Sequence, residues 1–150
     1  MTTGKVTLNE FIVERLDAGY RWIESLSEGV SEEQFYHQPT YDTNSIAWLV
    51  WHLSRWRDRV SASVTGDDQV WVSEGWAQIF GMEEDRTGLG DTTEQVASFR
   101  VPRDQVLGYA AAAHHAIVER VKSIPTELFD QQIASVYGDC LLYTSDAADE

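Results

Sequence analysis

The sequence predicts an all-helical fold, a bundle of amphipathic helices. Three long stretches repeat their apolar residues every three or four positions, which is the spacing of one helix face. Residues that begin or end helices stand at the borders of these stretches. No stretch of any length alternates apolar and polar residues as a half-buried strand does. Because each helix must bury its apolar stripe, packing the stripes together in a bundle is the simplest fold.

The first long helix is expected over residues 8–26. Thr7, followed by Glu10 three positions later, forms the capping-box pattern that starts a helix. The apolar residues of its stripe are Leu8, Phe11, Ile12, Leu16, Trp22, Ile23 and Leu26. A second capping pattern, Ser31 with Gln34, predicts a short helix that ends before the next proline.

The second long helix is expected over residues 44–65, and Gly66 ends it as glycine commonly ends a helix. Its apolar face is formed by Ile46, Leu49, Val50, Leu53, Val60 and Val64. The third long helix is expected over residues 103–121, between Pro102 and Pro125. Its stripe is formed by Val106, Ala110, Ala113, Ile117 and Val121.

Residues 66–100 form a long connection between the second and third long helices. This segment holds five glycines and many acidic residues, and it shows only a turn or two of helical pattern, near EGWAQIF and TTEQVASF. A connection of this length in a compact domain is usually functional or covers a site. Trp71 and Trp76 are candidates to fold back and wall a pocket, whereas Trp22 and Trp56, at helical spacing, are expected in the core.

A fourth helix is expected to open within PTELFDQQIASVYGD, but not to finish in this chain. Residues 140–150, CLLYTSDAADE, are similar to the translation of a transposase adapter used to prepare sequencing libraries. We therefore expect residues 1–139 to be an incomplete helical bundle domain and residues 140–150 to be a non-native tail.

Composition disfavours several classes of protein. The formal charge of -14, with only 11 basic residues, argues against a nucleic-acid partner, because phosphate binding needs clustered Lys and Arg. No apolar run is long enough to cross a membrane and no signal peptide is evident, so we expect a cytoplasmic protein without a membrane partner. Cys140 is the single cysteine, which leaves imidazole, carboxylate or water to hold any metal.

His52 is the candidate metal ligand. It lies at the edge of the apolar stripe of the second long helix, with Trp48 and Trp56 on either side. These two aromatic side chains would shield the imidazole from water and keep it neutral and able to coordinate a metal. A lone histidine at such an edge is more often packed or hydrogen-bonded than a ligand. Asp58 and the neighbouring arginines lie too far round the helix to orient the ring.

The other three histidines are weaker candidates. His114 lies near the middle of the apolar face of the third long helix, with His115 opposite it. For His114, a buried ring satisfied by a neighbouring polar group is favoured over a ligand. His37, in a loop expected between Tyr36 and Pro39, is expected at the surface. Because the sequence holds neither H-E-x-x-H nor G-x-S-x-G, it assigns no catalytic residue.

The order of these motifs resembles a known family. The segments NSIAWLVWHLSRWRD, VWVSEGWAQIFGM, TGLGDTTEQVASF and YAAAAHHAIVERV, in that order, are similar to the DinB-like metalloenzymes. The branch that the chain resembles most is related to the mycothiol-dependent maleylpyruvate isomerases. The resemblance runs from about Thr7 to Asp139.

This resemblance implies a DinB-like four-helix bundle, commonly a homodimer, that holds a divalent metal such as Zn²⁺ or Ni²⁺ with three histidines. His52 matches the ligand from the second helix. The other two ligands belong to the fourth helix, after SVYGD, where this chain continues with CLLYTS. The implied activity is a metal-dependent S-transfer or isomerisation that uses a low-molecular-weight thiol such as mycothiol and a small-molecule substrate.

Two alternatives stay open. In the first, the protein is a non-catalytic helical binding or stress-response protein, and His52 is a core residue. Two histidines about a turn apart, encoded after Asp139 in the natural gene, would favour the enzyme instead. In the second, the chain does not fold stably. Losing one helix of four exposes apolar surface worth roughly 25 cal/mol per Å², against a net stability of about 5 to 15 kcal/mol.

Overall fold

The structure, a computed structural model, describes residues 6–130 and is all-helical over that range, which confirms the expected fold class. In chain order, the elements are α1 (Leu8–Glu28), α2 (Glu32–Tyr36), α3 (Ile46–Thr65), α4 (Val70–Ser73), α5 (Trp76–Phe80), α6 (Thr93–Ala97), α7 (Arg103–Ser123) and the 3-10 helix η1 (Thr126–Asp130). The expected fourth long helix beyond η1, and the tail at residues 140–150, lie outside the described residues. None of the described helices combines the length and the apolarity that a membrane span requires.

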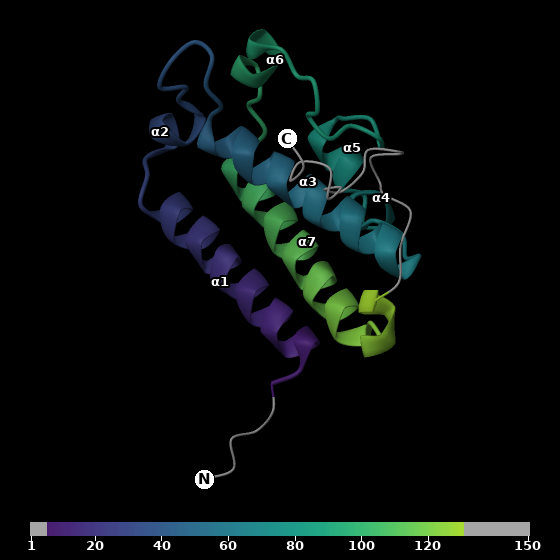
Figure 1. The fold of residues 1–150 in the computed structure, drawn as a ribbon. Helices are drawn as coiled ribbons and strands as arrows, with labels where there is room; N and C mark the ends of the chain where they lie inside the picture. Colours follow the sequence, from purple (N-terminus) through teal and green to yellow (C-terminus); the bar gives the residue numbers. More distant parts are fainter. Residues whose placement is uncertain (1–5, 131–150) are drawn as a thin grey trace, which may run out of the picture.

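The three long helices lie side by side, with α7 between α1 and α3 (Figure 1). The most extensive contact is between α3 and α7, and α1 packs against α7. The short helices α4 and α5, from the long connection, fold back onto α7. The two turns of helix expected in this connection are therefore confirmed as α5 and α6, and α4 is an additional one.

The helix ends follow from local capping chemistry. The backbone N–H of Thr7 donates to the carboxylate of Glu10 at 2.8 Å, and Ser31 with Gln34 forms the same reciprocal pair at the start of α2. Gly66 ends α3 with a φ of 77°, in the left-handed region that costs glycine little. Both capping boxes predicted from the sequence are confirmed, and all three long helices end within two residues of the expected positions.

The core lies where α3 and α7 meet the folded-back connection. Trp51, Trp71 and Tyr109 are fully buried, with the ring of Trp71 5.0 Å from that of Tyr109 and 6.3 Å from that of Trp51. The expectation that Trp71 walls a pocket is therefore wrong, because its large apolar ring gains more free energy between α3 and α7. Trp76 is half-buried and packs on Tyr109 at 5.7 Å.

The buried face of α3 differs from the expected one. Leu49 and Leu53, assigned to the apolar face from the sequence, are 47% and 42% exposed, whereas Arg55 and Asp58 are fully buried. Val50 is buried as expected, so hydrophobic spacing identified the buried face only in part, because it does not register charged residues that are buried in pairs.

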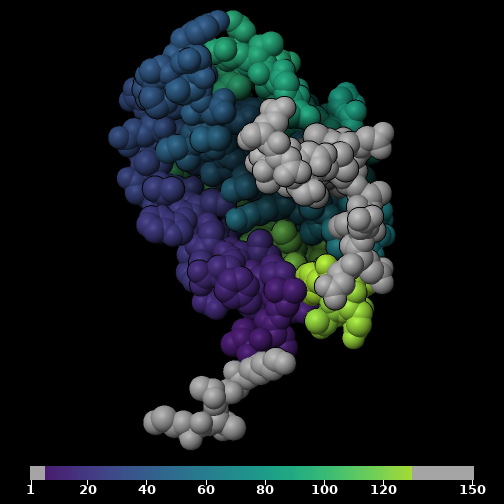
Figure 2. Space-filling view, in the orientation of Figure 1, coloured from purple at the N-terminus to yellow at the C-terminus, as the bar shows by residue number. Residues whose placement is uncertain are grey.

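The apolar stripe of α1 is also largely uncovered. Trp22 is 69% exposed and Phe11 is 52% exposed, so the expectation that Trp22 lies in the core is wrong. Within α1, all of which the structure describes, only Ser27 is buried. Exposed large apolar side chains occur on both α1 and α3, and parts of both helices are visible on the face that Figure 2 shows. Trp56, the other tryptophan expected in the core, is half-buried.

Candidate metal centre at His52

His52 lies in the middle of α3, half-buried between two indole rings. Its imidazole stacks on Trp48, with ring centroids 4.4 Å apart and planes 16° apart. The ring of Trp56 meets it edge-on at 6.2 Å. The aromatic setting predicted for His52 is therefore confirmed, and it follows from helical geometry, because residues four apart lie on one face of a helix. Two rings restrict water around the imidazole and limit its rotation.

The long connection supplies a hydrogen bond that orients this ring. Nδ1 of His52 lies 2.5 Å from the backbone carbonyl oxygen of Thr87. Because a carbonyl oxygen can only accept a hydrogen bond, Nδ1 carries the proton and donates it. In the neutral ring, the lone pair is therefore on Nε2, which forms no hydrogen bond with the described residues. A backbone carbonyl bonded to one ring nitrogen is the common arrangement behind a metal-ligating histidine.

Further contacts hold the connection against α3 near His52. The indole N–H of Trp48 donates to Oδ2 of Asp91 at 2.9 Å, and the guanidinium of Arg86 forms an ion pair with the same oxygen at 3.0 Å. Arg86 and Asp91 lie on either side of Thr87 in the sequence. Their contacts therefore hold the chain on both sides of the carbonyl group that accepts the hydrogen bond from His52. The sequence predicted that this connection covers a site. It did not identify Thr87, because every residue has a backbone carbonyl and the residue type does not show which one is used.

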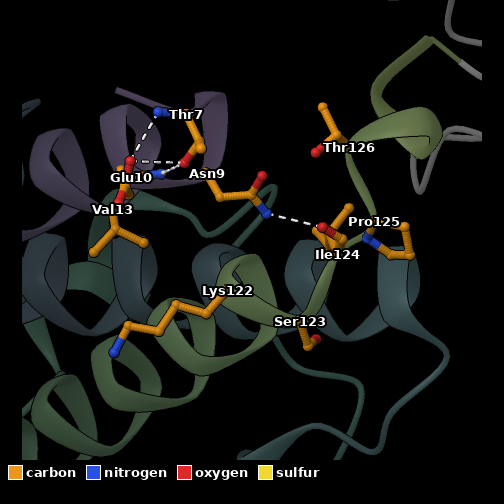
Figure 3. Close-up of a pocket in the computed structure, with 9 residues that line it drawn as sticks. All are labelled: Thr7, Asn9, Glu10, Val13, Lys122, Ser123, Ile124, Pro125 and Thr126. Carbon is orange, nitrogen blue, oxygen red and sulfur yellow. Dashed lines mark hydrogen bonds between the residues drawn. The ribbon is translucent and has the colours of Figure 1, made fainter. Parts of the chain in front are cut away.

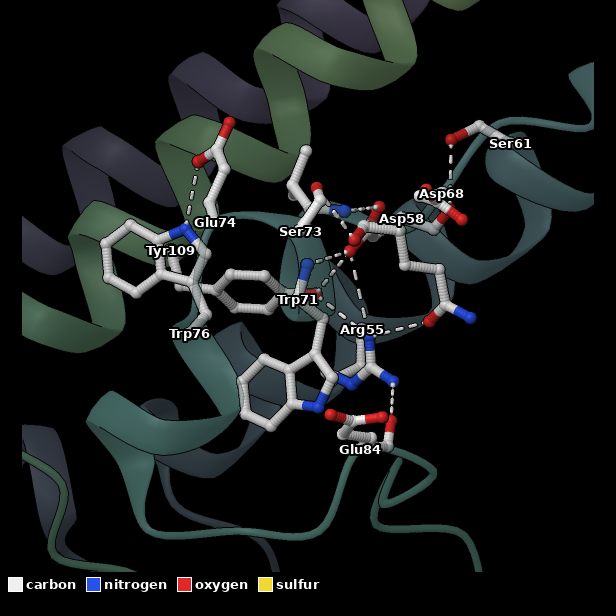
Figure 4. A network of polar contacts seen from close by, with 12 residues as sticks. Arg55, Asp58, Ser61, Asp68, Trp71, Ser73, Glu74, Trp76, Glu84 and Tyr109 are labelled. Atoms are coloured by element: carbon white, nitrogen blue, oxygen red, sulfur yellow. Dashed lines mark hydrogen bonds and ion pairs between the residues drawn. The ribbon is translucent and has the colours of Figure 1, made fainter.

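A buried cluster of charged groups lies one turn further along α3 (Figure 4). The carboxylate of Asp58 accepts hydrogen bonds from the backbone N–H groups of Val70 at 3.0 Å and Trp71 at 2.9 Å. The hydroxyl of Tyr109 donates to it at 3.1 Å, and Nη1 of Arg120 lies 3.1 Å from Oδ1. Burial, followed by the negative charge of Asp58, raises the pKa of Tyr109 far above its ordinary value. This hydroxyl therefore stays protonated as a donor.

Arg55 extends the cluster toward His52. Its Nε donates to the carbonyl oxygen of Arg86 at 2.9 Å, and its Nη2 donates to that of Glu84 at 3.3 Å. The guanidinium also lies 4.5 Å from the ring centroid of Trp71, in cation–π contact. Sequence reasoning correctly excluded Asp58 and the arginines as direct partners of His52, but it missed that Arg55 holds the segment that contacts His52. Its spacing of three residues from both His52 and Asp58 was the available signal.

His114 belongs to a separate contact between α7 and α1. Its Nε2 lies 2.9 Å from Oδ1 of Asp17, and its ring stacks on Tyr20 with centroids 4.2 Å apart. Burial lowers the pKa of His114, and the hydrogen bond and charge of Asp17 oppose this effect. The interpretation of His114 as a histidine with a polar neighbour is confirmed for Nε2, but the ring is half-buried and its Nδ1 has no hydrogen-bond partner among the described residues. His115 and His37 are exposed, as expected.

The described residues fit a divalent metal only in part. His52 presents one neutral nitrogen in an aromatic pocket, which suits Zn²⁺ or Ni²⁺. Within residues 6–130, however, no group of three histidine, cysteine, aspartate or glutamate side chains could hold the ion. The described residues therefore offer one candidate donor, His52, and any complete centre needs donors from outside this part of the chain.

A surface depression at the start of α1 is separate from His52. A cavity of about 490 Å³ lies between the start of α1 and the end of α7 (Figure 3). The side-chain amide of Asn9 crosses it and donates to the carbonyl oxygens of Val121 at 2.6 Å and Ile124 at 2.9 Å. These bonds satisfy acceptors that the end of α7 leaves unpaired. The cavity contains no imidazole or thiol, and we assign it a structural role.

Residues 15–137 match the sequence profile of the DinB superfamily, which is most of the chain. The chain belongs to this superfamily. A solved structure titled "conserved protein of locus" from Enterococcus faecalis is similar, with a TM-score of 0.77 and 20% sequence identity. The alignment covers 86% of this chain and 78% of that one, and at this identity it supports the fold alone. No curated protein matches the sequence. DinB proteins are often metal-binding, which agrees with the setting of His52.

Proposed function

We propose that the natural gene product is a divalent-metal-dependent DinB enzyme. It uses a low-molecular-weight thiol of the mycothiol type, either by transferring the thiol to a substrate or by using it to assist the isomerisation of a substrate. In this proposal His52 is one of three imidazole ligands, and a helix encoded after Asp139 supplies the other two. A small-molecule substrate and the thiol are the partners. When bound, the metal supplies a Lewis acid with open positions, at which a thiol loses its proton near neutral pH.

The observation that carries this proposal is the hydrogen bond from His52 Nδ1 to the carbonyl oxygen of Thr87. It presents Nε2 as the only lone-pair nitrogen of the neutral ring and holds the ring in one orientation. Stacking on Trp48 keeps the ring in place and restricts water on one side. A half-buried imidazole N–H needs an acceptor in any role, so the support lies in which nitrogen the bond from the connection, 35 residues away in sequence, leaves free.

The exposed apolar side chains of α1 and α3 give a second, independent support. Leu49 and Leu53 of α3 lie within one turn of His52, and each is more than 40% exposed. Trp22 and Leu26 of α1 are exposed as well, and exposed apolar side chains of this kind are what a further amphipathic helix would cover. A helix packed there would run past His52, where its own side chains could approach Nε2.

Two measurements test the proposal. The first is the natural gene sequence after codon 139, which should encode two histidines about one helical turn apart. The second is elemental analysis of the full-length protein, which should contain stoichiometric Zn²⁺ or Ni²⁺. His52→Ala should weaken metal binding at least about tenfold, because one of three ligands is lost.

His115→Ala is the matched control, because His115 is an exposed histidine on α7. It should leave metal content and affinity unchanged. Equal metal content in the wild type and in His52→Ala would refute the assignment of His52. A metal-loaded protein with no activity toward thiols and electrophilic acceptors would refute the thiol chemistry while leaving the ligand in place.

A further inference from the structure

The segment that contacts His52 passes over α3 with almost no space beneath it. We call residues 84–91 the strap. Gly88 of the strap has a φ of 84°, in the left-handed region. A Cβ atom at this position would lie 2.8 Å from Trp51, 2.9 Å from Trp48 and 3.0 Å from Nδ1 of His52. Real Cβ atoms are essentially never found as close as the two tryptophan contacts, and the contact with His52 is tighter than most, so both backbone conformation and space favour glycine.

The strap is anchored on both sides of this contact. On one side, the buried guanidinium of Arg55 donates to the carbonyl oxygens of Glu84 and Arg86, at 3.3 Å and 2.9 Å. On the other side, Oδ2 of Asp91 accepts from the indole N–H of Trp48 at 2.9 Å. The carbonyl of Thr87 is therefore held from two directions. Its approach to His52 follows from the absence of a side chain at the next residue, Gly88.

We propose that Gly88 is a positioning residue that fixes the tautomer of His52, with Arg55 as the anchor of the strap. Close approach at Gly88 brings the carbonyl of Thr87 to Nδ1, which holds the proton there and leaves the lone pair on Nε2. A free neutral histidine side chain carries its proton mainly on Nε2, which would block coordination through that atom. That this tautomer serves metal binding rests on the proposed function. The assignment of the proton to Nδ1 does not depend on it.

The chain offers a matched pair of glycines for the test. Gly90, two residues further on, has a φ of 79°, and a Cβ atom there would meet nothing within 4 Å. Gly88→Ala and Gly90→Ala therefore impose a similar backbone strain, and only the first adds a collision with His52 and its two tryptophan neighbours. A difference between the two variants reports on close approach and not on the general cost of replacing a left-handed glycine.

The readout is the ¹⁵N NMR spectrum of the metal-free, full 150-residue chain with labelled histidine, at mildly alkaline pH. Protonated and lone-pair ring nitrogens have distinct ¹⁵N shifts, and His52→Ala assigns the signals of His52 by their loss. We expect wild type and Gly90→Ala to carry the proton on Nδ1. Gly88→Ala should move most of the proton to Nε2, with helix content by circular dichroism unchanged.

A wild-type spectrum with the proton on Nε2 would overturn the proposal, as would identical tautomers in folded Gly88→Ala and Gly90→Ala. If Gly88→Ala does not fold, while Gly90→Ala does, Arg55→Lys decides the question. Lysine keeps the charge but replaces the two guanidinium nitrogens that donate to these carbonyls with a single nitrogen, so a shift of the proton toward Nε2 supports the proposal, and an unchanged tautomer overturns it. A full-length protein that binds no metal but keeps the Nδ1 proton would refute the proposed function alone.

Discussion

The guanidinium of Arg120 and the carboxylate of Asp58 form a buried ion pair, with Nη1 3.1 Å from Oδ1. Asp58 is on α3 and Arg120 is near the end of α7, so the pair links the two helices that share the largest contact of the fold. The same carboxylate accepts hydrogen bonds from the backbone N–H groups of Val70 and Trp71. These bonds attach the start of the long connection to the interface between α3 and α7.

Asp58→Asn should therefore destabilise the protein strongly. The substitution removes the charge that faces two buried guanidinium groups: it leaves Arg55 without its counter-ion, and it leaves Arg120 with only the exposed carboxylate of Asp67. Breaking a buried pair in this way costs about 3–5 kcal/mol. Urea unfolding followed by circular dichroism would measure the loss.

The control is Glu119→Gln, which removes the exposed ion pair between Glu119 and Lys122. This variant should unfold at the urea concentration of the wild type, because exposed pairs contribute little. If Asp58→Asn were as stable as Glu119→Gln, the buried cluster would not hold α3 to α7.

Trp71 and Trp22 should differ widely in their effect on stability. Trp71 is fully buried among aromatic rings of α3 and α7, whereas Trp22 is 69% exposed on α1. Trp71→Ala should cost about 3–5 kcal/mol, as truncation of a buried tryptophan usually does. Trp22→Ala should change the urea midpoint little in the 150-residue chain. Similar losses for the two variants would mean that Trp22 is covered in solution.

These two tryptophans also show how far the sequence determines the fold. Helical period and capping residues placed the long helices to within two residues, because both signals are local. Burial is a property of the whole assembly. The stripe of α1 predicts that Trp22 can be buried, but only a neighbouring element decides whether it is. Trp71 lies in a segment with no regular period, so nothing in its surroundings in sequence predicted the core.

The candidate site was predictable to a similar extent. Two aromatic residues at helical spacing from His52 correctly predicted its setting. The contact with Thr87 depends on how a connection of some 35 residues folds back, and the donors that fix this path, such as Arg55, bond to backbone carbonyls. Backbone acceptors are present at every residue, so no sequence pattern distinguishes the one that is used.

The pH dependence of stability should contain a contribution from His114. Because burial lowers the pKa of His114 below its ordinary value of 6.5, the unfolded chain binds a proton there more readily than the folded one. Stability from this residue is therefore fully present above about pH 6.5 and decreases as the pH falls toward the folded-state pKa. His114→Gln should make the urea midpoint less sensitive to pH between about 7 and 5.

His115→Gln is the control for this measurement, because His115 is exposed on the same helix. It should keep the pH dependence of the wild type. A steeper fall of stability at acid pH in His114→Gln than in His115→Gln would contradict the sign of the shift. That result would mean that the carboxylate of Asp17, 2.9 Å from Nε2, outweighs the burial of the ring.

The 150-residue chain should bind Zn²⁺ weakly, because its described residues supply one suitable donor. Its four histidines include one, His52, in a setting suited to a ligand, and His114 is bonded to Asp17 on a different interface. A single imidazole contributes too few bonds to hold the ion against water, since protein zinc sites use three or four ligands. Calorimetric titration with Zn²⁺, repeated with His52→Ala and His114→Ala, measures this directly. Tight binding that is lost in His114→Ala but kept in His52→Ala would place the metal at the α1–α7 interface and remove His52 as the centre.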